Sequence, residues 1–465
     1  MKHIHFIYTF LFGVAVLLFF GLFYPHHLHY QEQYQLFLFD SNYVWEIIRQ
    51  LGGVADLLGR FCTQFFLFAW VGAAIIAVLL MAVQLLMLRL FSLYIPSHSR
   101  GGAGVGWFYG LTFVPSFLLW LFLLDENALL GGVWAVLLTQ FAMWGCLQMP
   151  KGWKQCIAII VAILILYWIA WGGSHYYRYP TVFPTLLYVA WLLAVVLPFI
   201  IRVCHKWATA SSRPVVTFAS FVLVALVMGT LVWKNANFKA EKVMQYDFMA
   251  RYQQWNRIME TVNAEKPNNQ IGVTVQNLAL AMHGMLADHL FDYNQNGIAG
   301  LLPDVKEDAT SPLPTAEAFY QLGMIYVAQR TVFEAQEAIL DFQKSGRCYK
   351  RLAQTNLILG SYEVARKYLT ALKKTLFYRD WANETLPLLG NEEAIAKHPE
   401  YGRLRQMACD GDYYFSDHVT PDMLERLFFC NTENRLALEY LRAYYMLTDD
   451  RDGYAELIRK LRVKN

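Results

Sequence analysis

Charged side chains are scarce in this 465-residue chain. Asp, Glu, Lys and Arg make up 16% of the residues, whereas hydrophobic residues make up 56%. A typical soluble protein carries about a quarter charged residues. The shortage is confined to the first half, where apolar runs extend from Phe6 to Trp233 with short polar segments between them. This composition excludes a wholly soluble protein and predicts a membrane-embedded half (residues 1–234) followed by a soluble half (residues 235–465).

Several familiar motifs are also missing. The seven cysteines include no C-x-x-C pair, which argues against a zinc or redox site. The chain has no Walker loop, dinucleotide fingerprint or nucleophile elbow. The net charge of +3 is not gathered in a basic arm or face, so we expect no nucleic-acid partner. Cys409 and Cys430 can pair if their compartment is oxidising, although spacing alone does not set the geometry of a disulfide.

Long apolar runs predict seven transmembrane helices. A helix needs about 20 mostly apolar residues to cross the hydrocarbon core of a bilayer. The candidate spans are residues 5–24, 65–92, 107–124, 128–147, 155–172, 184–204 and 214–233. The first span is too long for the core of a signal peptide and lacks a small-residue cleavage site after it, so we expect an uncleaved anchor.

The distribution of basic residues predicts the orientation of these spans. With a cytoplasmic N-terminus, the inside segments carry eight Lys and Arg residues and the outside loops carry three. The inside residues are Lys2, Arg89, Arg100, Lys151, Lys154, Arg202, Lys206 and Arg213, and the outside residues are Arg49, Arg60 and Arg178. The soluble half then lies outside, which is the periplasm if the chain sits in the inner membrane of a Gram-negative bacterium.

The first outside loop, residues 25–64, is long and both aromatic and polar. The spacing of its apolar residues predicts short helices that lie in the membrane interface. Glu32 stands just beyond the first span, and Asp125 and Glu126 form the polar turn between the third and fourth spans on the same face. Carboxylates at a membrane face can bind a divalent metal such as Mg or Mn, or act as a general base. The alternative is that they only cap solvated loops.

Two arginines are candidates for holding a lipid phosphate. Asp56 and Arg60 are one helical turn apart, so a helix would place them side by side. Arg60 can bind a phosphate bidentately, or it can form a plain ion pair with Asp56 that orients the loop. Arg178 is the second candidate, with interfacial anchoring as its alternative role.

The arrangement of one helix, a long acidic outside loop and short-looped helices to a total of seven resembles the membrane module of the GT-C glycosyltransferases. These enzymes take sugars from polyprenyl-phosphate carriers, and their first outside loop carries a catalytic Asp or Glu followed closely by Tyr. The segment from Gln31 to Tyr34 is similar to this motif, although Gln31 replaces its first acid.

The resemblance to GT-C enzymes implies roles for particular residues. It implies that Glu32 is catalytic, with Asp56 as a second candidate, and that His29 and Tyr34 contact the substrate. Some members bind a metal in the loop after the third helix, which Asp125 and Glu126 match, and Gly59-Arg60-Phe61 is similar to an element of bacterial members. The chain has no Asp-x-Asp motif, and the resemblance covers about half of it. As a whole, the chain resembles an uncharacterised family of Bacteroidetes inner-membrane proteins, which implies no activity.

The soluble half predicts paired helices. Residues 351–369 contain Gly360 and Tyr362 at a turn, with Ala365 and Tyr368 at three-residue spacings, and so resemble a tetratricopeptide repeat. Residues 316–338 and 436–461 are predicted as further units. Stacked repeats present a concave face that binds peptides or proteins, so we expect a protein or peptide acceptor there. The alternative is a domain that merely packs on the membrane half.

The sequence therefore predicts an all-α protein with a seven-helix transmembrane bundle and a soluble, tetratricopeptide-like domain. The first functional hypothesis is a glycosyltransferase that uses a polyprenyl-phosphate-linked sugar at the periplasmic face. The alternative is a non-enzymatic membrane scaffold for envelope assembly. A transporter is less favoured, because no predicted span contains the charge pair that a proton relay needs.

Overall fold

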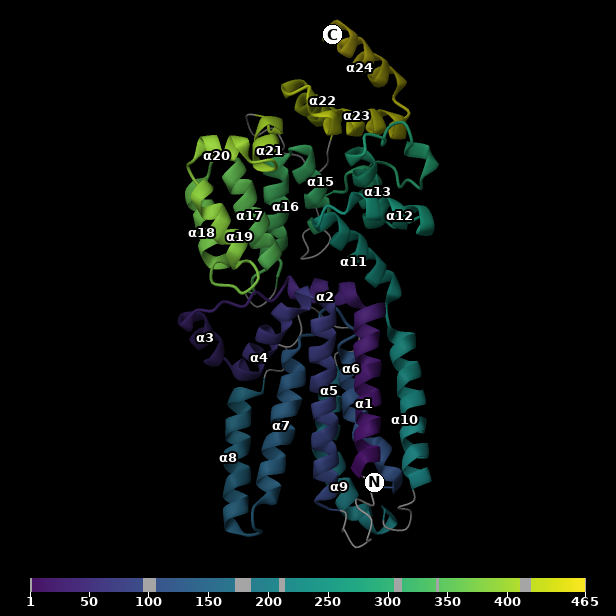
Figure 1. Ribbon diagram of the computed structural model, residues 1–465, viewed down its shortest axis with the longest axis vertical. Coiled ribbons are helices and arrows are strands. Elements are labelled where there is room, and N and C mark those ends of the chain that lie inside the picture. Colours follow the sequence, from purple (N-terminus) through teal and green to yellow (C-terminus); the bar gives the residue numbers. More distant parts are fainter. Residues whose placement is uncertain are drawn as a thin grey trace. The chain divides into compact units, whose positions relative to one another are not determined.

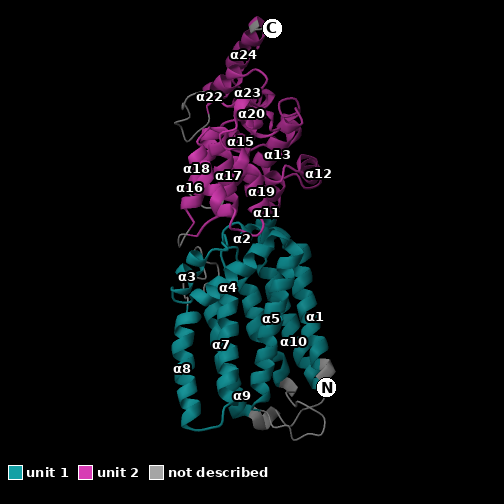
Figure 2. Cartoon of the chain, turned by 60° about the vertical axis from the view of Figure 1, so that its left-hand side comes forward, with its two compact units in different colours: residues 1–241 teal, residues 242–465 magenta. Residues whose placement is uncertain are grey.

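The structure is a computed structural model that describes residues 2–94, 106–171, 185–208, 214–304, 312–339, 343–409 and 420–464. The chain divides into two compact units, Met1–Glu241 and Lys242–Asn465 (Figure 2). The described residues form helices and no β-strand, with one isolated bridge between Asn296 and Ile298. The all-α prediction is therefore confirmed for the described part of the chain.

Four helices in the described part of the first unit are long and apolar enough to cross a membrane. They are α1 (Lys2–Leu18) with its π-helical continuation η1 (Phe19–Phe23), α5 (Ala69–Ser92), α9 (Leu186–Ala208) and α10 (Pro214–Asn235). Their apolar stretches of 19 to 24 residues match the thickness of the hydrocarbon core. A membrane protein with four candidate spans is thus supported.

The prediction of seven transmembrane helices is supported only in part, because the other three segments do not form clear spans in the described part of the chain. The segment at 107–124 forms a 3-10 stretch, η3 (Gly106–Phe113), followed by the short helix α6 (Val114–Phe122). Helix α7 (Gly131–Gln148) includes the polar residues Gln140 and Gln148, and α8 (Trp153–Ile169) has only 17 residues. Each segment is helical and lies alongside the four longer helices (Figure 1), but each is shorter or more polar than a clear span.

The first loop folds into short helices, as its periodicity predicts. They are α2 (Pro25–Glu32), α3 (Ser41–Ile48), α4 (Gly53–Thr63) and the 3-10 turn η2 (Gln64–Leu67). Pro25 suits the first turn of α2 because the missing amide has no partner to lose there. Asp40 caps α3 by accepting the amides of Asn42 and Tyr43. Gly52 has a φ of 75°, a left-handed conformation that lets the chain turn into α4.

The second unit is built from short helices packed in pairs. Its elements are the end of α11 (Phe238–Arg251), α12 (Trp255–Glu265), α13 (Gln270–Met282), η6 (Leu290–Asp292), α14 (Ile298–Leu301), α15 (Pro312–Leu322), α16 (Ile325–Glu337), α17 (Gly346–Ile358), α18 (Tyr362–Leu372), α19 (Arg379–Thr385), η8 (Leu386–Leu388), α20 (Glu392–Lys397), α21 (Tyr401–Met407), α22 (Pro421–Cys430), α23 (Arg435–Thr448) and α24 (Arg451–Lys464). Helices α15 with α16, α17 with α18, and α22 with α23 form closely packed pairs, and α16 also packs on α17.

The α17–α18 pair is the hairpin predicted around Gly360. Gly360 has a φ of 78°, and the amide of Ser361 donates to the carbonyl of Asn356 at 2.8 Å, which closes the end of α17. Ala353 and Ala365 are fully buried, so small side chains let the two helices approach. A disulfide joins Cys409 and Cys430, with their Cα atoms 5.8 Å apart, and ties the residues after α21 to the end of α22.

Candidate functional site

Helix α2 carries the predicted catalytic residue and is held at its start by Glu241. The amides of His26 and His27 donate to the two carboxylate oxygens of Glu241 at 2.7 and 2.8 Å. A carboxylate is favourable there because the first amides of a helix have no partner within the helix and its dipole attracts negative charge. Sequence analysis missed Glu241, because it lies more than 200 residues away in the chain.

The other face of α2 is bound to the acidic turn. The Nε2–H of His27 donates to the carbonyl of Leu123 at 2.9 Å. The side-chain amide of Gln31 donates to the backbone carbonyl of Ala128 at 2.9 Å. It also lies 3.5 Å from the backbone carbonyl oxygen of Asp125. The structure therefore brings α2 and the turn at residues 123–128 together through backbone carbonyls, which the sequence motif alone could not indicate.

Glu32 ends α2 in a buried polar environment. Its exposed fraction is 5%, and Gln33 and Gln35 are 2% exposed. The side-chain amide of Gln35 has no hydrogen-bond partner within the described residues. Burying polar groups is unfavourable unless they form hydrogen bonds. The Gln35 side chain therefore has hydrogen-bonding groups that no described residue satisfies.

The acidic turn is predicted to bind a metal together with Glu32, and one of its carboxylates already has a partner in the described part of the structure. Asp125 is 9% exposed, and its Oδ1 accepts the amide of Asn127 at 2.8 Å. No three His, Cys, Asp or Glu side chains among the described residues are arranged to hold a metal ion. The prediction of a Mg or Mn site at Glu32, Asp125 and Glu126 stays a prediction.

Asp56 and Arg60 form the ion pair that their spacing predicts. The Nε of Arg60 donates to Oδ2 of Asp56 at 2.8 Å, and both residues are buried on α4. Burial strengthens such a pair but removes both groups from water. Removing either partner would leave an uncompensated charge, so the pair orients α4. Whether Arg60 also holds a phosphate stays a prediction.

The remaining predicted substrate contacts lie on or beside α2. Tyr34 is 1% exposed, with its ring 4.9 Å from that of Tyr30. His29 lies with its Nδ1 3.4 Å from Nδ1 of His26. Arg178 lies outside the described residues, as do Arg100 and Arg213 of the predicted inside segments.

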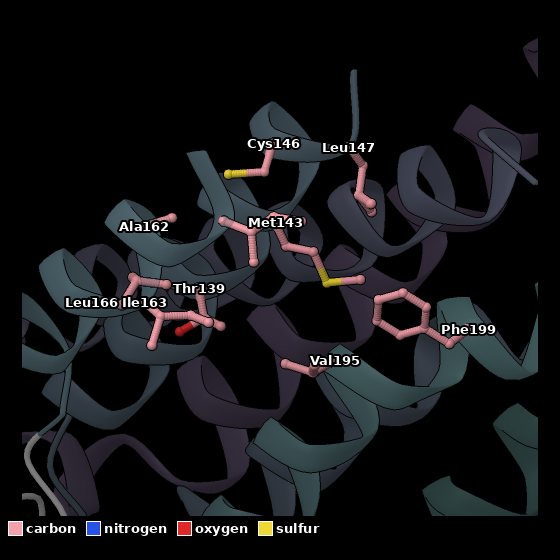
Figure 3. A pocket seen from close by; sticks show the side chains of 10 residues that line it. Thr139, Met143, Cys146, Leu147, Ala162, Ile163, Leu166, Val195 and Phe199 are labelled. Carbon is pink, nitrogen blue, oxygen red and sulfur yellow. The ribbon is translucent and has the colours of Figure 1, made fainter. Parts of the chain in front are cut away.

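An apolar cavity lies between α7, α8 and α9. It measures roughly 270 Å³ and is open on one side. Its lining side chains are mostly apolar, such as those of Met143, Leu166 and Phe199, and Figure 3 shows Met143 extending toward Phe199. The hydroxyl of the lining residue Thr139 donates to the carbonyl of Ala135 at 2.8 Å and accepts from Nε1 of Trp191 at 2.9 Å.

Comparison with known proteins identifies the family. A family of unknown function (DUF6057) matches residues 1–175 and 169–465, which together span the chain. No curated protein and no solved structure matches it. The chain therefore belongs to the DUF6057 family, whose function is unknown.

Proposed function

We propose that the chain is a membrane-bound glycosyltransferase that transfers a sugar from a polyprenyl phosphate carrier to an acceptor hydroxyl. The observation that carries the proposal is the position of Glu32. This buried carboxylate ends a helix that is held by Glu241 at its start and by the carbonyls of the acidic turn along its side. A general base must be held in one place within reach of the acceptor, and α2 offers such support.

The proposed reaction is a single displacement. Glu32 takes the proton of the acceptor hydroxyl as the acceptor oxygen forms a bond to the anomeric carbon. The bond from that carbon to the phosphate oxygen breaks, and the polyprenyl phosphate leaves with the electron pair. The Arg60 guanidinium, already beside Asp56, would stabilise the leaving phosphate.

We also propose a cellular location and an orientation for the chain. We infer seven crossings, with α6, α7 and α8 as shorter spans beside the four long ones. The excess of basic residues on one face then places the N-terminus in the cytoplasm and the soluble unit in the periplasm of a bacterial inner membrane. The Cys409–Cys430 disulfide supports an oxidising compartment for the soluble unit. Its stacked helix pairs would present a protein acceptor.

A non-enzymatic scaffold is the second candidate. The adjacent helix pairs α15–α16 and α17–α18 favour it, because stacked pairs commonly serve as binding surfaces. In that case the buried polar residues of α2 would only fix the first loop on the bundle.

Glu32→Gln in cells separates the two candidates. Glu46→Gln is the matched control, because Glu46 is an exposed carboxylate on α3 of the same loop. The transferase proposal expects Glu32→Gln to accumulate normally but to lose envelope glycosylation, while Glu46→Gln keeps it. Unchanged glycosylation in Glu32→Gln at normal abundance would favour the scaffold.

A further inference from the structure

The cavity between α7, α8 and α9 is apolar because its few polar groups are bonded within the protein. Two of its lining side chains carry a hydroxyl or a thiol. The hydroxyl of Thr139 bonds to Ala135 and Trp191. The thiol of Cys146 lies 3.6 Å from the carbonyl oxygen of Ala158. The other lining side chains are apolar, so this space of about 270 Å³ suits a hydrocarbon group better than a polar ligand.

Helix α8 forms one side of the cavity and exposes apolar side chains around most of its surface. It packs on α7 and α4, yet none of its 17 residues is buried. Ile157, Ile160 and Leu164 are among its exposed residues. A helix that is apolar all round is stable in a bilayer and not in water. We therefore expect the hydrocarbon chains of lipids to surround α8 and to lie beside the cavity.

Aromatic side chains mark both ends of α8. Trp153 is exposed at its start, and Tyr167 and Trp168 are exposed near its end. The ammonium of Lys154 lies 5.8 Å from the centre of the Trp153 ring. Trp and Tyr rings favour the level of the lipid headgroups on both sides of a bilayer. This pattern supports the crossing of α8 inferred above and places Lys154 at the level of the headgroups.

A basic turn lies beside one end of the cavity. Leu147, which lines the cavity, is in the last turn of α7, and the exposed Lys151 and Lys154 follow it at the start of α8. The side-chain amide of Gln155 donates to the carbonyl of Cys146 at 3.2 Å, which holds the first turn of α8 against the end of α7. A molecule whose apolar part fills the cavity can therefore bring its polar end to these two lysines.

The helices around the cavity contain no acidic residue that could neutralise this turn. No Asp or Glu occurs in the sequence between Glu126 and Glu241, a stretch that includes α7, α8, α9 and α10. The charges of Lys151 and Lys154 thus favour an anion from outside these helices. Lys and Arg clusters next to membrane helices attract the anionic headgroups of lipids.

We propose that the cavity and the basic turn together bind one anionic phospholipid. An acyl chain would fill the space between α7, α8 and α9, and the phosphate of the headgroup would lie beside Lys151 and Lys154. Burial of apolar surface favours the chain, and opposite charge favours an anionic headgroup over a zwitterionic one. The inference rests on the proposed crossing of α7 and α8 but not on the transferase reaction, which uses Glu32.

Native mass spectrometry of the full chain in detergent tests the headgroup. The delipidated protein is titrated separately with phosphatidylglycerol and with phosphatidylcholine that carries the same acyl chains. We expect one phosphatidylglycerol to bind more tightly than phosphatidylcholine. Changing Lys151→Gln and Lys154→Gln together should weaken the binding of phosphatidylglycerol roughly tenfold to thirtyfold. Lys234→Gln with Lys239→Gln is the matched control, because it removes the same charge from exposed positions on α10 and α11.

A second pair of variants tests the acyl chain. Ala162 lines the cavity (Figure 3), and its neighbour Val161 is exposed on α8. Ala162→Trp should fill the space and weaken the binding of both lipids at least tenfold, whereas Val161→Trp should leave it unchanged. If Ala162→Trp fails to fold, the variant of the two exposed lysines still decides the question.

Three results would overturn the proposal. They are equal binding of the two lipids by the unaltered protein, unchanged binding of phosphatidylglycerol in the Lys151 and Lys154 variant, and unchanged binding in folded Ala162→Trp. The mass of a dimer without bound lipid would assign the cavity to a second copy of the chain and would also contradict the proposal. Sugar transfer is measured separately, so a failure here is distinguishable from a failure of the proposed transferase.

Discussion

At the scale of single residues, Glu241 is expected to make stability depend on pH. Burial raises the pKa of its carboxyl group to about 7, although the amides of His26 and His27 act in the opposite direction. The pKa in the folded protein lies above the unfolded value of 4.5, so protonation of Glu241 favours the folded state. This contribution to the free energy of unfolding is complete below pH 4.5. It is lost as the pH rises through 7, and the loss amounts to at most about 3 kcal/mol.

Glu241→Gln should remove this dependence. The unfolding temperature of the unaltered protein in detergent should fall between pH 5 and pH 8 by more than that of Glu241→Gln. The histidines of α2 are present in both proteins, so the difference isolates Glu241. Glu46→Gln, on the exposed face of α3, should retain the full slope. Equal slopes in Glu241→Gln and the unaltered protein would contradict this role of Glu241.

Residues whose partners lie nearby in the chain were the easiest to predict. Asp56 and Arg60 pair as their one-turn spacing requires. Glu241 was missed because only the folded chain brings it to the start of α2. Composition likewise predicts that carboxylates share a membrane face but does not indicate that Oδ1 of Asp125 accepts the amide of Asn127.

At the scale of elements, the close packing of α4 against α7 depends on two glycines, Gly59 and Gly131. A Cβ added to Gly59 would lie 2.5 Å from the amide nitrogen of Gly131 and 2.7 Å from its Cα. Because backbone atoms cannot move aside as a flexible side chain can, Gly59→Ala should displace α4 and its Asp56–Arg60 pair. We expect a loss of about 1–3 kcal/mol, measured as a lower unfolding temperature.

Gly145→Ala is the matched control for Gly59→Ala. A Cβ added to Gly145, in α7, meets no atom within 4 Å. Alanine is also the better helix former, so the stability of Gly145→Ala should stay level or rise by about 0.5–1 kcal/mol. If both variants are equally stable, the close contact between α4 and α7 does not hold the first loop.

The positions of helices were more predictable than their suitability as membrane spans. Long apolar runs predicted seven segments, and the described part of each is helical, although only four are long and apolar enough to be clear spans. The lengths of these helices depend on local backbone conformation, which a hydropathy profile averaged over many residues does not resolve. The 3-10 stretch η3 precedes α6, and α8 ends at Ile169, before the predicted end of that span at residue 172.

At the scale of the whole molecule, the second unit contains a disulfide that should stabilise it. The Cys409–Cys430 bond closes a loop of 21 residues, so Cys409→Ser should lower the stability of this unit by about 3 kcal/mol. Cys156→Ser, at an exposed free cysteine on α8, should have little effect. Unfolding of the purified protein with and without reductant measures both. If reductant does not change the unaltered protein, the bond does not stabilise this unit.

The predicted boundary near Lys234, where the charged fraction changes abruptly, lies close to Glu241, after which the structure divides into its second unit. Function is the least predictable level, because a buried carboxylate such as Glu32 suits both a catalytic and a structural role.

The most direct test of the central claim is sugar transfer by the purified protein. The full chain in lipid nanodiscs is supplied with radiolabelled sugar on polyprenyl phosphate and with an acceptor protein, and loss of label from the lipid phase is measured. We predict transfer by the unaltered protein and by Glu46→Gln, with Glu32→Gln slower by roughly a hundred- to ten-thousandfold, the usual contribution of a general base. Equal rates for Glu32→Gln and the unaltered protein would contradict the account.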